Sequence, residues 1–182
     1  GDLTALNQSR KALTEKGKEE AIRIIETTEL KNDRVLVVYL PDCHESLAGI
    51  IAGRIREKYH RPAFVLTGGE TSAKGSGRSI ESYSMYEELV KCADLMIQFG
   101  GHPMAAGLSI EEKNIEEFRR RLNVNCTLTD EELRPKIVID VPMPVSYITK
   151  ELVEQILLLE PFGKGNTKPV FAQKNLRVLD YS

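Results

Sequence analysis

The sequence predicts an α/β fold, chiefly because an apolar strand, an amphipathic helix and a second apolar strand follow one another in its first half. Residues 34–40 contain a continuous apolar run, Val35 to Leu40, that is rich in β-branched side chains, which is typical of a short buried strand. Residues 45–59 place apolar side chains on one helical face, and residues 62–67 again indicate a strand. Strands joined through a helix of this length run parallel with a right-handed crossover, so we expect a parallel pair here.

A long, mostly polar helix is expected ahead of this unit, over residues 3–29. Its apolar side chains form only a thin stripe among charged ones. A helix that can bury so narrow a face suits a connector between two lobes.

The elements expected after the parallel pair are shorter, and glycines lie within and between them. We expect a glycine-rich strand over residues 71–82, then a helix that Ser84 and Glu87 open with a capping box. A Gly-Gly-His loop precedes a short strand over residues 105–110 and an amphipathic helix over residues 115–122.

A polar, acidic stretch over residues 123–134 indicates a boundary, because such stretches between periodic segments are typical of linkers. A second unit follows it. There we expect a strand at residues 137–139, a helix over residues 149–159 that Pro161 ends, and short strands at residues 170–171 and 176–179.

The overall composition gives no direct sign of a nucleic-acid partner. The net charge is −2, with 25 Lys and Arg against 27 Asp and Glu, so any basic footprint has to be local. The 3 cysteines are far apart, which favours reduced thiols in a cytoplasmic protein over a disulfide framework. The sequence shows neither a secretory signal nor a membrane-spanning segment, so no membrane partner is expected.

The run Gly100-Gly101-His102 is the clearest candidate for a binding site. Glycines accept positive φ and let a ligand approach the backbone, because no Cβ stands in the way. A histidine beside them can donate, accept or carry charge near neutral pH. The segment therefore suits a phosphate or another anion; the alternative is a tight turn with an incidental histidine.

Arg78 is the second candidate, within the sequence Ser76-Gly77-Arg78-Ser79. A guanidinium fork matches two phosphate oxygens, and the two serines add hydroxyl donors. The flanking glycines, Gly75 and Gly77, would let a ligand come close. The alternative is an exposed strand arginine in a surface ion pair.

Other basic positions are weaker candidates. His44 lies near the start of the expected helix, where free N–H groups favour anions, and Asp42 and Glu45 have capping-box spacing there. The alternative for His44 is a side chain that only packs at the helix end. A further basic set could line a groove for a nucleic-acid strand or form a solvated face: Arg54, Lys58, Arg61 and Lys74.

Five segments, spread over nearly the whole chain, carry a family resemblance. They are residues 6–11 (LNQSRK), residues 44–54 with the pattern His-x-x-x-x-Gly-Ile-x-Ala, residues 74–80 (KGSGRSI), residues 99–107 (FGGHPMAAG) and residues 159–166 (LEPFGKGN). Together they resemble the RecJ exonucleases of the DHH phosphoesterase superfamily. The last segment is the most specific, because smaller members of the superfamily lack that extension.

The resemblance implies a fold in three parts. A connector helix would occupy residues 1–29. Residues 30–126 would form a DHH-associated α/β domain, with a mixed, partly parallel sheet flanked by helices. Residues 127–182 would hold a linker, a helix and the beginning of a partial OB-fold region.

The resemblance also implies a function, that of the C-terminal, substrate-binding part of a single-stranded-DNA-specific exonuclease. Such an enzyme is a hydrolase that digests DNA 5′→3′ in repair and recombination. His102 would contact the substrate phosphate near the metal centre, as a catalytic residue and not as a metal ligand. The other phosphate-binding residues would be His44, Ser76, Gly77, Arg78, Ser79, Gly100 and Gly101.

The sequence lacks the Asp-His-His triplet that gives the superfamily its name. Neither its 3 histidines nor its scattered aspartates form the cluster that two-metal chemistry needs. The resemblance thus implies Mn²⁺ or Mg²⁺ in an N-terminal DHH domain outside this sequence. This part alone would bind no cofactor and would be inactive, with that domain and single-stranded DNA as its partners.

Two other functions are compatible with the sequence. One is a non-catalytic nucleic-acid-binding module, like the lobes found on alanyl-tRNA synthetases and on regulatory proteins. The other is the corresponding lobe of an enzyme that cleaves oligoribonucleotides or cyclic dinucleotides. The extension after residue 134 argues against the second.

Overall fold

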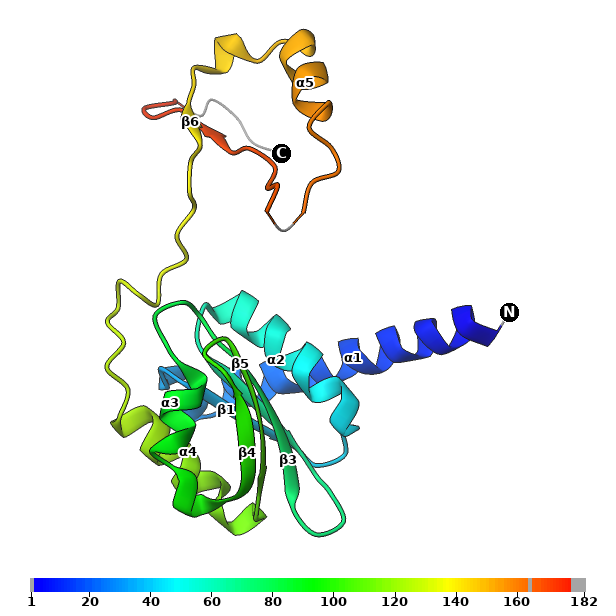
Figure 1. Ribbon diagram of the computed structural model, residues 1–182, viewed down its shortest axis with the longest axis vertical. Coiled ribbons are helices and arrows are strands. Elements are labelled where there is room, and N and C mark those ends of the chain that lie inside the picture. Colours follow the sequence, from blue (N-terminus) through cyan, green and yellow to red (C-terminus); the bar gives the residue numbers. More distant parts are fainter. Residues whose placement is uncertain (1, 164, 178–182) are drawn as a thin grey trace. The chain divides into compact units, whose positions relative to one another are not determined.

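A computed structural model describes residues 2–163 and 165–177 of the chain (Figure 1). It divides the chain into two compact units, Gly1–Pro135 and Lys136–Ser182. No helix in the described part is long and apolar enough to cross a lipid bilayer.

The first unit is built on a five-stranded sheet of order β1-β2-β3-β5-β4. Its strands are β1 (Leu36–Leu40), β2 (Ala63–Thr67), β3 (Ala73–Arg78), β4 (Met96–His102) and β5 (Ala105–Ile110). Only β1 and β2 pair in parallel; every other pair is antiparallel. The mixed, partly parallel sheet expected from the sequence is therefore confirmed, including the crossover through α2 (Glu45–Tyr59).

Helices cover both faces of this sheet, and each face has its own apolar cluster (Figure 1). On one face, α1 (Asp2–Thr27) and α2 pack Ile25, Ile51 and Ile55 against β1 and β2. On the other face lie α3 (Met85–Val90) and α4 (Ile115–Val124). There the ring of Phe118 meets the ring of Phe64 edge to face at 5.4 Å. Burial on both faces explains why β1 and β2 read as continuous apolar runs.

Helix α1 uses only its second half for packing. Ala21 and Ile25 are buried, whereas Leu6 and Leu13 are exposed. At Gly17 the helix passes so close to α2 that an added Cβ would lie 2.6 Å from Ile51 Cδ1. The first half of α1 extends beyond the domain, as Figure 1 shows.

The Gly-Gly-His segment was predicted as a loop, and this is wrong. Gly100, Gly101 and His102 form the end of β4, paired in register with β5, and Pro103-Met104 make the hairpin turn. Strand β4 was not predicted because its two glycines are weak strand formers and conceal the alternation of side chains. The strand expected over residues 71–82 is shorter than predicted, because the chain leaves the sheet after Arg78.

In its described residues, the second unit contains one α-helix and a small two-stranded sheet. Helix α5 (Lys150–Leu157) begins at its N-cap Thr149, whose side chain accepts from Leu152 N. Strands β6 (Val141–Pro142) and β7 (Phe171–Ala172) pair in parallel. The strand expected at residues 137–139 is wrong: these residues are irregular and exposed, with Ile137 at 78%. Of the strand expected at 176–179, residues 176–177 are not in a strand and 178–179 lie outside the described residues.

Short 3₁₀ turns complete the two units. They are Glu29–Asn32, Ala93–Leu95, Glu112–Asn114 and Val145–Tyr147. The first three connect elements of the first unit, and the last follows β6 in the second unit.

Candidate phosphate-binding groove

Strand β3 presents two different sets of side chains, because successive residues of a strand point to opposite faces. Ala73, Gly75 and Gly77 face the α3 and α4 side of the sheet. A Cβ on Gly77 would lie 2.5 Å from Met85 Sδ and 2.6 Å from Phe64 Cε1. Gly77 is buried there, so it makes room for the apolar core and not, as predicted, for a ligand.

The opposite face of β3 continues across β5 and β4 as a polar surface. Residues directly opposite each other in antiparallel strands share a face. The register gives three such rows: Lys74–Ser109–Gln98, Ser76–Gly107–Gly100 and Arg78–Ala105–His102. We call this set the groove face.

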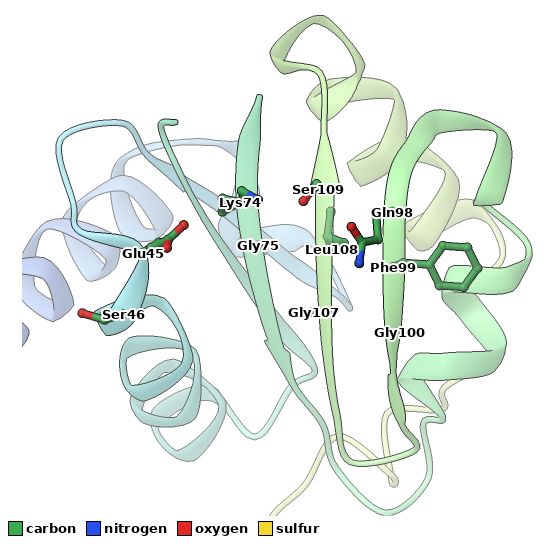
Figure 2. Close-up of a pocket in the computed structure, with 10 residues that line it drawn as sticks. All are labelled: Glu45, Ser46, Lys74, Gly75, Gln98, Phe99, Gly100, Gly107, Leu108 and Ser109. Carbon is green, nitrogen blue, oxygen red and sulfur yellow. The ribbon is translucent and has the colours of Figure 1, made fainter. Parts of the chain in front are cut away.

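A pocket of about 520 Å³ lies over the groove face, beside the beginning of α2. Figure 2 shows Glu45 and Ser46 on the helix, and Lys74, Ser109 and Gln98 on three strands. A neighbouring pocket of about 730 Å³ at the ends of β1 and β2 also includes Glu45 and Lys74. The concave surface therefore extends past Lys74 to the loop before α2.

The middle row leaves the floor of this surface bare. Gly107 and Gly100 face each other in register. A Cβ on Gly100 would meet no atom within 4 Å, and one on Gly107 would meet only Gly75 O at 3.8 Å. Alanine would fit at both positions, so packing does not require glycine there. The absence of a side chain at both positions exposes the backbone of β4 and β5 to a ligand that lies on this surface.

At Gly101, glycine is favoured by the backbone conformation. Its φ is +151°, and an added Cβ would lie 2.5 Å from Ala105 O. L-residues with a side chain rarely adopt such a φ. Gly101 therefore shapes the β4–β5 hairpin and so sets where His102 emerges.

The Arg78 guanidinium lies at the edge of the groove face, half-buried against α2. Its Nη1 donates to Ser76 Oγ at 3.1 Å and to Gly77 O at 2.7 Å. Its Nη2 lies against Gly49 of α2. Among the described residues no carboxylate pairs with Arg78. The surface ion pair considered as an alternative is thus absent there, and the guanidinium keeps an unneutralised charge with free N–H groups.

His102 stands at the same end of the groove face. It is exposed and pairs with Ala105, whose other neighbour is Arg78. Two strand spacings of about 4.8 Å put the backbones of Arg78 and His102 about 10 Å apart. The structure thus brings together the two side chains that sequence reasoning ranked first.

Two other predicted residues are placed less favourably for a ligand. Ser79 is buried, and its hydroxyl donates to Tyr83 O at 2.6 Å. His44 is the N-cap of α2: its Nδ1 accepts from Ser46 N at 3.2 Å, so His44 itself caps the helix and the expected Asp42–Glu45 capping box does not. His44 is exposed but lines the second pocket, at the Lys74 end.

The basic set divides in a similar way. Lys74 lines both pockets. Arg61 is held by the carbonyls of Lys31 and Asp33, and Arg54 pairs with Glu57. Burial raises the pKa of the Cys43 thiol, which disfavours the thiolate form.

Sequence reasoning missed several residues of the groove, namely Ser46, Gly49, Gln98, Gly107 and Ser109. In residues 105–110, the alternation of small or polar residues with apolar ones gave only a weak indication that Gly107 and Ser109 lie on one face of a strand. The pairing of β3 with β5, which places them beside Ser76 and Lys74, has no signature in a single sequence.

Among the described residues, no group of three or more His, Cys, Asp or Glu side chains is arranged to hold a metal ion.

Comparison with known proteins identifies two domain families. The DHHA1 domain matches residues 32–127, and the RecJ OB domain matches residues 139–182. The chain is 36% identical over 172 residues to the single-stranded-DNA-specific exonuclease RecJ of Bacillus subtilis, covering 92% of this chain and 22% of that protein. It is 35% identical over 180 residues to RecJ of Escherichia coli, covering 93% of this chain and 31% of that protein.

A solved structure agrees with these matches. The crystal structure of RecJ from Thermus thermophilus in complex with Mg²⁺ has a TM-score of 0.81 and 29% identity, over 94% of this chain and 26% of that one. The chain thus spans between 22% and 31% of the length of these relatives. It belongs to the RecJ family, with the DHHA1 domain and the RecJ OB domain of that family in sequence.

Proposed function

We propose that this chain is the substrate-binding part of a single-stranded-DNA-specific exonuclease that digests 5′→3′ and acts in DNA repair and recombination in the cytoplasm. The observation that carries the proposal is the Arg78 guanidinium, which has no carboxylate partner among the described residues and lies in one row with His102 beside a bare glycine floor. Single-stranded-DNA-specific exonucleases of the RecJ family are similar over more than nine-tenths of the chain.

The groove face supplies different contacts along its length. Arg78 and Ser76 hold the terminal phosphate through charge-assisted hydrogen bonds, which are the stronger kind. Lys74 lies four residues away on β3, about 13 Å at 3.3 Å per residue, and attracts a phosphate further along the strand. The exposed backbone at Gly100 and Gly107 lets the sugar–phosphate chain lie close to the sheet.

His102 contacts the phosphate that undergoes hydrolysis. An exposed imidazole at the end of β4 can donate a hydrogen bond to a phosphate oxygen and stabilise charge that develops there. In this proposal His102 acts on the substrate and does not bind metal.

Metal ions enter through another part of the enzyme. Two related RecJ structures are complexes with Mg²⁺ or Mn²⁺. We assign such ions to an N-terminal DHH domain beyond this sequence, with residues 1–29 as the connector and residues 127–182 as the start of the OB region. Bound there, the ions would stabilise the attacking and leaving oxygens of phosphodiester hydrolysis. The chain alone is then inactive, and it orients the strand toward that domain.

The RecJ OB match over residues 139–182 favours this proposal over a lobe of an oligoribonucleotide or cyclic-dinucleotide hydrolase. A non-catalytic binding module would use the same groove, but it would need no catalytic partner domain.

Fluorescence anisotropy tests the proposal. A 5′-phosphorylated single strand and a blunt duplex are titrated with the chain, with Arg78→Ala and with Arg120→Ala. Arg120 lies on α4, on the other face of the sheet, so its removal changes the net charge equally outside the groove. We expect single-strand preference, weaker binding at higher salt, and a loss of about tenfold with Arg78→Ala alone, as for one charge-assisted contact.

Equal affinity of Arg78→Ala and the unaltered chain for the single strand would contradict the proposal. Preference for the duplex would contradict it as well.

A further inference from the structure

We infer that Gly49 is a positioning residue for the phosphate site, because its missing side chain leaves the space that the Arg78 guanidinium occupies. The inference rests on the proposed role of Arg78. It concerns a residue of α2 that has no polar side chain of its own.

Helix α2 lies close to the side chains of β3 at Gly49. A Cβ added there would lie 2.7 Å from Arg78 Nη2, 3.0 Å from Ser76 Oγ and 3.4 Å from Arg78 Cζ. All three atoms belong to the two side chains that hold the phosphate in our proposal. A methyl group at position 49 would therefore displace the guanidinium, and with it the Nη2 donors that face the helix.

The fold itself does not require glycine at this position. The buried face of α2 is formed by Leu47, Ala48, Ile51, Ala52 and Ile55, and Gly49 lies beside it. The atoms that a Cβ would meet are the ends of side chains, which can move, and not backbone. Alanine is also the better helix former, so stability alone would favour alanine at position 49.

Two contacts on β3 complete the arrangement. Ser76 Oγ and Gly77 O accept from Nη1, which holds one side of the guanidinium against the strand. Gly49 leaves room for the other side, so Nη2 lies between strand and helix with its N–H groups free for a phosphate oxygen. Gly49 is also the glycine of the His-x-x-x-x-Gly-Ile-x-Ala segment, for which this clearance gives a physical reason.

The same helix provides a matched control. Gly53 follows one turn later, and a Cβ there would meet no atom within 4 Å. Gly53→Ala makes the same chemical change in the same helix without approaching Arg78.

The test compares Gly49→Ala, Gly53→Ala, Arg78→Ala and the double variant Gly49→Ala/Arg78→Ala in the full chain. For each, the ratio of affinities for a 5′-phosphorylated and a 5′-hydroxyl single strand is measured together with the melting temperature. We expect Gly49→Ala to lower the ratio about tenfold, as Arg78→Ala does, with an equal or higher melting temperature. Gly53→Ala should keep the ratio, and Gly49→Ala should have no further effect once Arg78 is gone.

The outcomes separate this inference from the proposed function. If Arg78→Ala loses the preference for the 5′-phosphate and Gly49→Ala keeps it, the inference is overturned and the function stands. If Arg78→Ala keeps the ratio of the unaltered chain, or that chain shows no preference, both fail. A Gly49→Ala chain that melts at a markedly lower temperature or fails to fold overturns the inference, because Gly49 would then serve the fold.

Discussion

On the α3 and α4 face of the sheet, glycines at positions 75 and 77 lie under Leu108, Phe64 and Met85, and a Cβ added at either would lie 3.0 Å or less from a side-chain atom. On the groove face, glycines at positions 100 and 107 have open space above them. The first pair lies on β3, and the second pair lies on β5 and β4, the next two strands of the sheet. Where the core presses on the strand, glycine serves packing; where nothing covers it, glycine leaves backbone available to a ligand.

Gly77→Ala should have the largest effect on stability. The new methyl group would lie within 2.8 Å of Met85 Sδ and of two ring atoms of Phe64. Overpacking of a dense core costs about 1–3 kcal/mol of unfolding free energy. Urea denaturation measures this loss, and a change under about 0.5 kcal/mol, the scale of ordinary surface substitutions, would break the comparison between the faces.

Gly101→Ala should follow, through the backbone. Its φ of +151° and the nearby Ala105 carbonyl leave no relaxed place for a Cβ. We expect a loss of about 1–2 kcal/mol, within the range for strained backbone at a residue with a side chain. Thermal unfolding checks the loss, and an unchanged melting temperature would mean that the hairpin adapts at little cost.

Gly100→Leu should leave stability nearly unchanged but impair binding. The side chain would enter the open space over the floor and cover the backbone of the middle row. We expect about a tenfold loss of single-strand affinity, equivalent to about 1.4 kcal/mol, in an anisotropy titration. Unimpaired affinity would show that the strand does not pass over Gly100. Val124→Ala, an exposed position on α4, is the control.

Gly107→Ala should have the smallest effect. Its Cβ would touch only Gly75 O, at 3.8 Å. Replacing a glycine in relaxed backbone changes unfolding free energy by about 0.4–1 kcal/mol in the stabilising direction. Urea denaturation in parallel with Gly77→Ala gives the sharpest contrast, and a loss as large as that of Gly77→Ala would refute the distinction between the two glycine pairs.

How far the sequence predicts this structure depends on the kind of information each element needs. Helix α2 was expected over residues 45–59 and is found at Glu45–Tyr59, because local periodicity specifies it. Strand β5 was likewise expected over residues 105–110 and is found there. The strand predicted at residues 137–139 was wrong. Their β-branched side chains favour a strand, but a strand needs a pairing partner, which the local sequence does not reveal.

The groove could be predicted only in part, for the same reason. Arg78 and His102 were chosen on their chemistry, but their meeting in one row depends on the order β3-β5-β4, in which non-consecutive strands pair. The face on which each glycine lies decides whether it packs or stays open. That face follows from register, which is why Gly77 was assigned to the ligand and Gly107 was missed. Gly49 was missed because its closeness to Arg78 depends on how α2 packs on β3.

The most direct test maps binding onto the two faces by amide chemical shifts, while a 5′-phosphorylated single strand is titrated into the ¹⁵N-labelled chain. Our account predicts shifts concentrated on the groove face, at Lys74, Ser76, Arg78, Gly100 and His102, and at Gly49 beside it. Shifts confined to the first half of α1 or to the second unit, with the groove face unchanged, would contradict it.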